Sequence, residues 1–227
     1  MVEVGAGLGS LTVALADLGA HVLAVELDRS LVPALEEVVA GRPNVRVLVA
    51  DALHVEWPRI LGEGPWTMAS NLPYKVAVPV VMALLERAPQ VGRLVVMVQR
   101  EVGERLAAGP GGPAYGAVSV RVAYHCETEL LRRVPPSVFW PEPNVESVVV
   151  ELTRRDRAPV DVPPERLFRV VEEGFAQRRK TMANAIVRLG STRDEAATLL
   201  RDCGIDPRAR AESLSLDQFA CLAERRS

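Results

Sequence analysis

The chain has 227 residues, of which 48% are hydrophobic, and a formal net charge of −2 at pH 7. This length and apolar content suffice for one larger domain and a small second one. No apolar run reaches the roughly 18–20 residues that a membrane helix needs. The chain also opens without the basic and then apolar segment of a signal peptide. The charge balance argues against nucleic-acid binding through bulk charge, and we expect a globular cytoplasmic protein.

The three cysteines, Cys126, Cys203 and Cys221, lie far apart, form no CxxC pair and have no ligand histidines nearby. They predict neither a disulfide framework nor a zinc site. We therefore expect reduced, structural thiols and no bound metal. His21, His54 and His125 show no partner pattern, and no role is predicted for them.

Short apolar runs alternate with amphipathic segments over the first hundred residues. The runs predict β-strands and the stretches between them predict helices. This alternation indicates an α/β fold, with a parallel sheet covered by helices on both faces. The predicted strands are 1–4, 21–26, 45–50, 67–70 and 93–99.

Residues 129–155 place two β-branched runs on either side of a proline-rich connection, which predicts an antiparallel pair that closes the sheet. After the linker at 154–164 the composition is helical. We place the domain boundary so that 1–157 form the α/β domain and 158–227 a small all-helical domain. Residues 116–124, GAVSVRVAY, are ambiguous, because their alternation suits a strand whereas their place after a glycine-rich loop suits a helix.

The first strand runs directly into Gly5, Gly7 and Gly9, and a predicted helix follows. Glycine lets the backbone turn sharply and approach a ligand, to which the helix N-terminus offers free amides. A dinucleotide-binding GxGxxG fingerprint would need its third glycine at Ser10. The observed GxGxG spacing is typical of S-adenosylmethionine-dependent methyltransferases. A glycine-rich turn without a ligand is the alternative.

Two acids follow the next two strands. Glu26 ends the second strand, where a carboxylate can accept ribose hydroxyls, and Asp51 follows the third, placed to meet an adenine amine. Each acid alone could instead cap a helix or be solvated. Open α/β sheets bind ligands at the carboxyl ends of neighbouring strands. The glycines and both acids together therefore predict S-adenosylmethionine as the cofactor.

The fourth strand ends at Asn71-Leu72-Pro73-Tyr74, a turn without an acid, a base or a nucleophile. A methyl sulfonium loses its methyl group without a proton, so the enzyme has to align the nucleophile and free its lone pair. If Asn71 and the Pro73 carbonyl accept the hydrogens of an adenine amine, its nitrogen can pyramidalise. Tyr74 would stack on the base. The alternative is a structural turn, with Asn71 bonded to the local backbone and Tyr74 in the core.

These motifs, together with AYGAVSV, VPPSVFWPEPNVESVVVEL and FAQRRKTMANAI, resemble the ribosomal RNA adenine dimethyltransferase family, in particular its bacterial small-subunit branch, over residues 2–186. The resemblance implies a Rossmann-like class I methyltransferase sheet with an antiparallel last strand. It also implies dimethylation of two adjacent adenines in the 3′-terminal hairpin of small-subunit ribosomal RNA. By position, Gly5, Glu26, Asp51 and Asn71 match the cofactor contacts. The resemblance makes 116–124 a helix.

The resemblance also implies contacts with the substrate RNA, within an immature small ribosomal subunit. Phe139 matches an aromatic beside the active site and could stack on the target base, although a core position is the alternative. Arg178, Arg179 and Lys180 match the start of an RNA-contacting helix and would grip phosphates. A solvated helix face is the alternative. The sequence shows no dimer signal, and we expect a monomer that binds no membrane.

Two other functions remain open. One is an antibiotic-resistance methylase of large-subunit ribosomal RNA, although AYGAVSV and QRRKT fit the small-subunit enzyme better. The other is a non-catalytic assembly factor of the small subunit. The family has a few dozen further residues before the glycine motif, which close over the cofactor. Because the first strand would be central in the sheet, we expect a start codon assigned too late rather than a true truncation.

Overall fold

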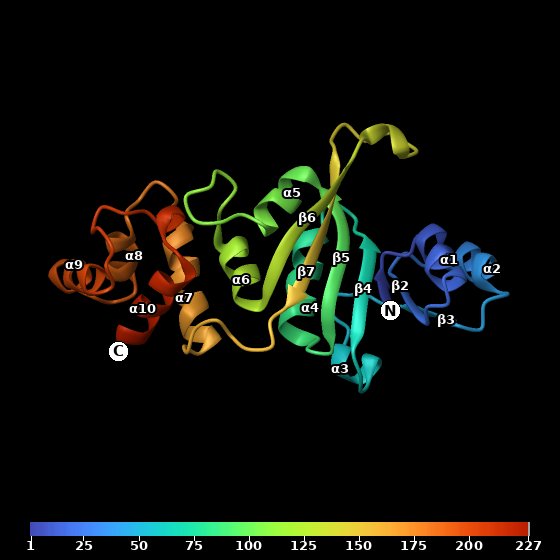
Figure 1. Cartoon of the computed structure of the whole chain (residues 1–227), viewed down its shortest axis with the longest axis horizontal. Helices are drawn as coiled ribbons and strands as arrows, with labels where there is room; N and C mark the ends of the chain where they lie inside the picture. Colours follow the sequence, from blue (N-terminus) through green and yellow to red (C-terminus); the bar gives the residue numbers. More distant parts are fainter. Residues whose placement is uncertain (227) are drawn as a thin grey trace. The chain divides into compact units, whose positions relative to one another are not determined.

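The computed structural model describes residues 1–226, which form two compact units (Figure 1). The first unit consists of Met1–Gly103 and Glu127–Arg154. The second consists of Glu104–Cys126 and of the chain from Arg155 onward. This division differs from the expected one at 157/158, because the segment before Cys126 belongs to the helical unit. The physical reason is burial, since this segment contributes to the core of the second unit.

The first unit is built on a seven-stranded sheet with the order β3-β2-β1-β4-β5-β7-β6. Strands β3, β2, β1, β4 and β5 pair in parallel, and β7 pairs with β5 antiparallel. The five predicted parallel strands and the antiparallel closure are thereby confirmed. The strands are β1 Val2–Val4, β2 Val22–Glu26, β3 Val45–Val49, β4 Trp66–Asn71, β5 Val91–Gln99, β6 Cys126–Val134 and β7 Ser147–Arg154.

Helices connect the parallel strands of the sheet. In α4 the buried side chains include Ala77, Val80, Val81 and Leu84, spaced so that they share one face of the helix. Each of the valine and leucine side chains contributes about 1.5–3 kcal/mol on full burial. The helices of this part of the chain are α1 Ser10–Asp17, α2 Val32–Val39, α3 Trp57–Leu61, α4 Ala77–Arg87 and α5 Arg100–Leu106.

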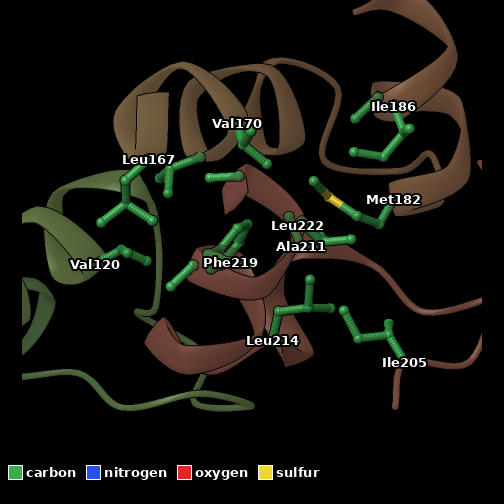
Figure 2. Close-up of a cluster of buried hydrophobic side chains, with 14 of the residues drawn as sticks. Val120, Leu167, Val170, Met182, Ile186, Ile205, Ala211, Leu214, Phe219 and Leu222 are labelled. Atoms are coloured by element: carbon green, nitrogen blue, oxygen red, sulfur yellow. The ribbon is translucent and has the colours of Figure 1, made fainter. Parts of the chain in front are cut away.

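The second unit is helical, as expected. Its core gathers around Phe219, which is fully buried, with Leu167 and Val170 of α7 facing it from across the core (Figure 2). Capping boxes start two of the helices, at Thr192 and at Ser215. The helices are α6 Ala117–His125, α7 Pro164–Ala176, α8 Met182–Arg188, α9 Arg193–Asp202 and α10 Leu216–Arg225. The helix expected at 116–124 is confirmed as α6.

The cysteines depart from expectation. Cys203 and Cys221 form a disulfide that connects the end of α9 to α10, so the prediction of three reduced thiols was wrong for these two. Cys126 is buried and is not part of a disulfide within residues 1–226. Cysteines 18 residues apart meet here only because α9 and α10 pack side by side. Among residues 1–226, no helix is long and apolar enough to cross a bilayer.

Candidate functional site

The candidate site lies at the carboxyl ends of four parallel strands. Gly5 follows β1, Glu26 ends β2, Asp51 follows β3 and Asn71 ends β4. Because these strands are consecutive in the order β3-β2-β1-β4, their ends lie next to one another along one edge of the sheet. The edge predicted from the sequence as a ligand site is therefore present.

The glycine loop takes a backbone shape that other residues adopt only under strain. Gly5, Gly7 and Gly9 have φ angles of +75°, +57° and +84°, in the left-handed region. The amides of Gly5 and Ala6 donate to the carbonyl oxygen of Val25 at 2.8 and 3.3 Å, which ties the loop to β2. No atom lies within 4 Å of the position that a Cβ on Gly7 would occupy, so the space there is open.

Glu26 holds the glycine loop from the end of β2. Its Oε2 accepts from the Gly7 amide at 2.7 Å, and its Oε1 accepts from the amides of Leu27 and Asp28, both at 2.8 Å. The residue is only 7% exposed. A carboxylate has about four acceptor positions, so these three bonds leave it room for one more donor. Glu26 therefore shapes the loop as well as offering an acceptor to a ligand.

A second buried acid, Glu3, lies in β1 below the loop. It is 2% exposed, and its Oε2 accepts from the Thr12 hydroxyl at 2.6 Å. Burial raises the pKa of Glu3 to about 7, the Thr12 hydrogen bond opposes this rise, and the charge of Glu26 adds to it. Glu3 is not among the site residues that the sequence motifs predict. An acid between two valines in a central strand was the available signal.

Asp51 is oriented by two hydrogen bonds. Its Oδ1 accepts from the Leu53 amide at 2.9 Å, and its Oδ2 lies 2.9 Å from Nδ1 of His54. The bond from Leu53 and then that from His54 lower the pKa of Asp51. Both side chains line a pocket of about 570 Å³ against β3 and α3. His54, for which no role was predicted, thus holds one of the predicted site residues.

The turn after β4 differs from the structural alternative considered for it. The Asn71 side chain is exposed and has no hydrogen-bond partner among residues 1–226, so it is not bonded to the local backbone. The Pro73 carbonyl accepts from the Val76 amide at 3.0 Å. Tyr74 is half-buried, and its hydroxyl shares a 3.0 Å hydrogen bond with Oγ of Ser147, the first residue of β7.

The glycine loop and this turn are in contact. A Cβ on Gly5 would lie 3.1 Å from Cδ of Pro73. Directly below, the Ser70 hydroxyl oxygen of β4 accepts from the Val4 amide of β1 at 2.8 Å. The structure therefore brings Gly5, the rest of the loop with Glu26, and the Asn71–Tyr74 turn to one place.

The remaining predicted residues occupy other parts of the chain. Phe139 is half-buried in the first unit, just after the short 3₁₀ helix η1 (Pro136–Val138), and its amide donates to the Pro136 carbonyl at 3.0 Å. Arg178, Arg179 and Lys180 are all exposed. They form a turn of the second unit between α7 and α8, rather than the first turn of a helix.

The chemistry of the sheet edge fits an adenosyl ligand. It offers open space before Gly7, the carboxylate of Glu26, and two apolar side chains, Leu8 and Leu27, that are 60% and 63% exposed. Such a ligand combines hydroxyls that need acceptors with apolar surface that gains from contact. The doubly wound sheet and this loop define a class I S-adenosylmethionine-dependent methyltransferase.

Comparisons with known proteins give the family. The family model described as ribosomal RNA adenine dimethylase matches residues 1–226, and the chain belongs to this family. A protein of Moorella thermoacetica named ribosomal RNA small subunit methyltransferase A is 45% identical over 98% of this chain and 81% of its own length. The protein of the same name from Thermobifida fusca is 44% identical over 100% of this chain and 80% of its own.

Solved structures agree on the fold. A dimethyladenosine transferase from Plasmodium falciparum superimposes with a TM-score of 0.79 at 22% identity, covering 97% of this chain and 87% of that one. The 23S rRNA methyltransferase ErmE gives a TM-score of 0.73 at 26% identity, covering 99% of this chain and 89% of its own. The first similarity confirms the predicted fold class, and the second relates the chain to another RNA methylase.

Proposed function

We propose that this protein dimethylates the exocyclic amines of two adjacent adenines in the 3′-terminal hairpin of small-subunit ribosomal RNA. The chain is an enzyme of the ribosomal RNA adenine dimethylase family, and S-adenosylmethionine is its methyl donor. One observation carries the assignment of the acceptor site. The Asn71 amide is exposed and unpartnered among the described residues, on a turn that touches the glycine loop through Pro73.

The proposed chemistry needs hydrogen-bond acceptors rather than a base. S-adenosylmethionine supplies a methyl group on a positively charged sulfur. The sulfur is the leaving group and needs no proton to leave. Asn71 Oδ1 accepts one amine hydrogen and the Pro73 carbonyl, which keeps one lone pair beside its bond from Val76, accepts the other. Holding both hydrogens out of the ring plane localises the nitrogen lone pair, an interaction that strengthens in the transition state.

We propose that Tyr74 provides the face on which the target adenine stacks. Its ring is anchored through the hydroxyl to Ser147, so that little rotational freedom remains to be lost when a base arrives. Base–aromatic stacking contributes about 1–3 kcal/mol per base. Phe139 is proposed as a second stacking surface from the loop between η1 and β7.

The second unit is proposed to supply backbone contacts to the RNA. Arg178, Arg179 and Lys180 are exposed and have no ion pair among residues 1–226, whereas Arg188 nearby is paired with Glu173. Unpaired cations are free to bind phosphates, which gives affinity that depends on salt but not on sequence. We further propose that the enzyme acts as a cytoplasmic monomer on the immature small subunit.

Transfer of labelled methyl groups to unmodified small ribosomal subunits tests the function. The wild type is expected to label them, and Asn71→Ala is expected to be slower by at least about 100-fold, as for the loss of one transition-state hydrogen bond. S-adenosylmethionine binding, measured by calorimetry, should change much less. Loss of cofactor binding with turnover retained at saturation would contradict the role assigned to the amide.

The likeness to ErmE favours a second candidate, methylation of large-subunit ribosomal RNA. The relatives named for the small subunit are more similar, at 45% and 44% identity against 26%. A parallel assay with unmodified large subunits separates the two. Label in large subunits and none in small ones would overturn the proposal. Binding to small subunits without any binding of S-adenosylmethionine would instead support a non-catalytic assembly factor.

A further inference from the structure

Trp140 is 98% exposed, more than any other large apolar side chain in the part of the chain that the structure describes. The other two tryptophans are held in place. Trp57 is fully buried and its Nε1 donates to Ala52, and Nε1 of Trp66 donates to Leu61. The Trp140 indole has no hydrogen-bond partner among residues 1–226. A tryptophan is seldom left in water in this way, so its ring is available to a partner.

The chain that leads to Trp140 carries exposed apolar and cationic side chains. Val138 in the same loop is 62% exposed. Just before the loop, the edge strand β6 carries Arg132 and Arg133, both exposed. Neither guanidinium has an ion pair or hydrogen bond within residues 1–226, whereas Arg93 of the same sheet is paired with Glu151. One exposed acid, Glu142, follows Trp140 in the loop.

The loop is also joined to the proposed acceptor site. It carries Phe139 directly before Trp140, and it ends at Ser147, whose hydroxyl bonds Tyr74 of the Asn71–Tyr74 turn. When an RNA strand places an adenine in this turn, the nucleotides next to that adenine lie close enough to contact the neighbouring protein surface. Aromatic rings that stack on bases, combined with cations that contact phosphates, are the usual means of binding single-stranded RNA.

We propose that the Trp140 indole stacks on an unpaired base of ribosomal RNA that neighbours the methylated adenines, while the arginine of β6 that shares its face, Arg132 or Arg133, contacts an adjoining phosphate. Trp140 is then a substrate-binding residue separate from the Asn71–Tyr74 turn. This inference rests on the proposed function. It commits to RNA as the occupant because the strand that leads to this unpartnered ring carries unpaired guanidinium groups, and such a combination complements a phosphate backbone with planar bases.

The test compares Trp140→Ala and Trp140→Phe with the wild type on unmodified small subunits. Loss of one stacked base should raise the KM of Trp140→Ala by about 5- to 150-fold and leave kcat nearly unchanged. Trp140→Phe should restore most of the affinity because it keeps a ring. Leu18→Ala is the control, since Leu18 is 86% exposed in the same unit and should have no effect. Equal KM values for Trp140→Ala and the wild type would overturn the inference.

Fluorescence provides a readout that does not require methyl transfer. The wild-type minus Trp140→Phe difference spectrum isolates the exposed indole, and a single-stranded adenine-containing RNA oligonucleotide should quench it. No quenching at RNA concentrations that saturate binding would also overturn the inference. Failure of the wild type to methylate small subunits, with quenching intact, would count against the proposed function and leave the RNA-stacking role of Trp140 standing.

Discussion

Gly5 and Pro73 touch: the position that a Cβ on Gly5 would take lies 3.1 Å from Cδ and 3.4 Å from Cγ of Pro73. Gly5 belongs to the loop proposed to bind the cofactor, and Pro73 belongs to the turn proposed to bind the target base. The loop and the turn thus approach each other closely at a residue without a side chain, where an added Cβ would crowd the Pro73 ring.

Gly5→Ala should therefore impair both halves at once. The substitution places a methyl group against the Pro73 ring at a residue with φ of +75°, so the loop or the turn must shift. We expect weaker S-adenosylmethionine binding in calorimetry and slower methyl transfer. Gly19→Ala is the matched control, because Gly19 has φ of +85° and nothing within 4 Å. In denaturant unfolding, Gly19→Ala should lose only about 1–2 kcal/mol of unfolding free energy, because alanine is strained in the left-handed conformation. Equal behaviour of the two variants would contradict a role for the contact.

Glu26→Gln should damage the loop that Glu26 holds. One acceptor oxygen becomes an NH₂ group that faces backbone amides, which leaves buried donors unpaired at about 1–3 kcal/mol. Cofactor affinity should fall at least about tenfold, and the free energy of unfolding should fall with it. Glu36→Gln changes an exposed acid of α2 and should be neutral in both measurements. An unaltered cofactor affinity in Glu26→Gln would exclude this carboxylate from the site.

The Tyr74–Ser147 hydrogen bond predicts that the hydroxyl of Tyr74 contributes to stability, whereas its ring contributes to methyl transfer. Tyr74→Phe and Ser147→Ala each remove the bond and should cost about 1 kcal/mol of stability, with the double variant little worse than either single one. Tyr74→Phe should keep methyl transfer, whereas Tyr74→Ala should lose it. Equal activity of Phe and Ala at this position would show that the base does not stack there.

The buried Glu3 should make stability depend on pH. In the unfolded chain its carboxyl ionises near 4.5, whereas in the folded protein its pKa is raised to about 7. The folded state therefore binds more protons between these values, and stability falls as pH rises from about 4.5 to 7, then levels off. Relative to Glu3→Gln, the wild type should lose about 2–3 kcal/mol of unfolding free energy over this interval. The unfolding free energies of both proteins are measured by denaturant unfolding at each pH. If they change with pH by the same amount, a buried, protonated Glu3 is ruled out.

The sheet could be predicted from the sequence because its central strands are apolar on both faces. All five residues of β2 are buried. A strand buried on both faces appears in the sequence as a continuous apolar run, whereas a surface helix alternates apolar and polar residues. The edge that gathers Gly5, Glu26 and Asp51 followed from topology alone. Residues 116–124 were harder, because the helix α6 buries Ser119 beside Val120. Ser119 lies inside because its hydroxyl donates to the Arg105 carbonyl at 2.6 Å, and a buried polar residue hides the helical period.

Other features depend on packing that sequence spacing does not encode. The Cys203–Cys221 bond needs α9 and α10 to lie together, and the Tyr74–Ser147 bond joins a turn after β4 to the first residue of β7. The pairing of Asp51 with His54 is local, and an Asp followed by a histidine three residues later could have suggested it. The domain division missed α6, because its contacts are with helices that follow much later in the chain.

The return of the chain to the sheet after α6 has a consequence for how this protein can be divided. The Tyr115 hydroxyl donates to the Leu214 carbonyl at 2.9 Å, and Val120 belongs to the same buried cluster as Phe219. Residues 155–163 form no helix or strand, as in a linker that proteases can cut. A cut there separates these partners onto two fragments. Neither fragment then holds a whole helical unit. A gene fragment that starts at residue 158 would encode α7 to α10 without α6, which packs against them.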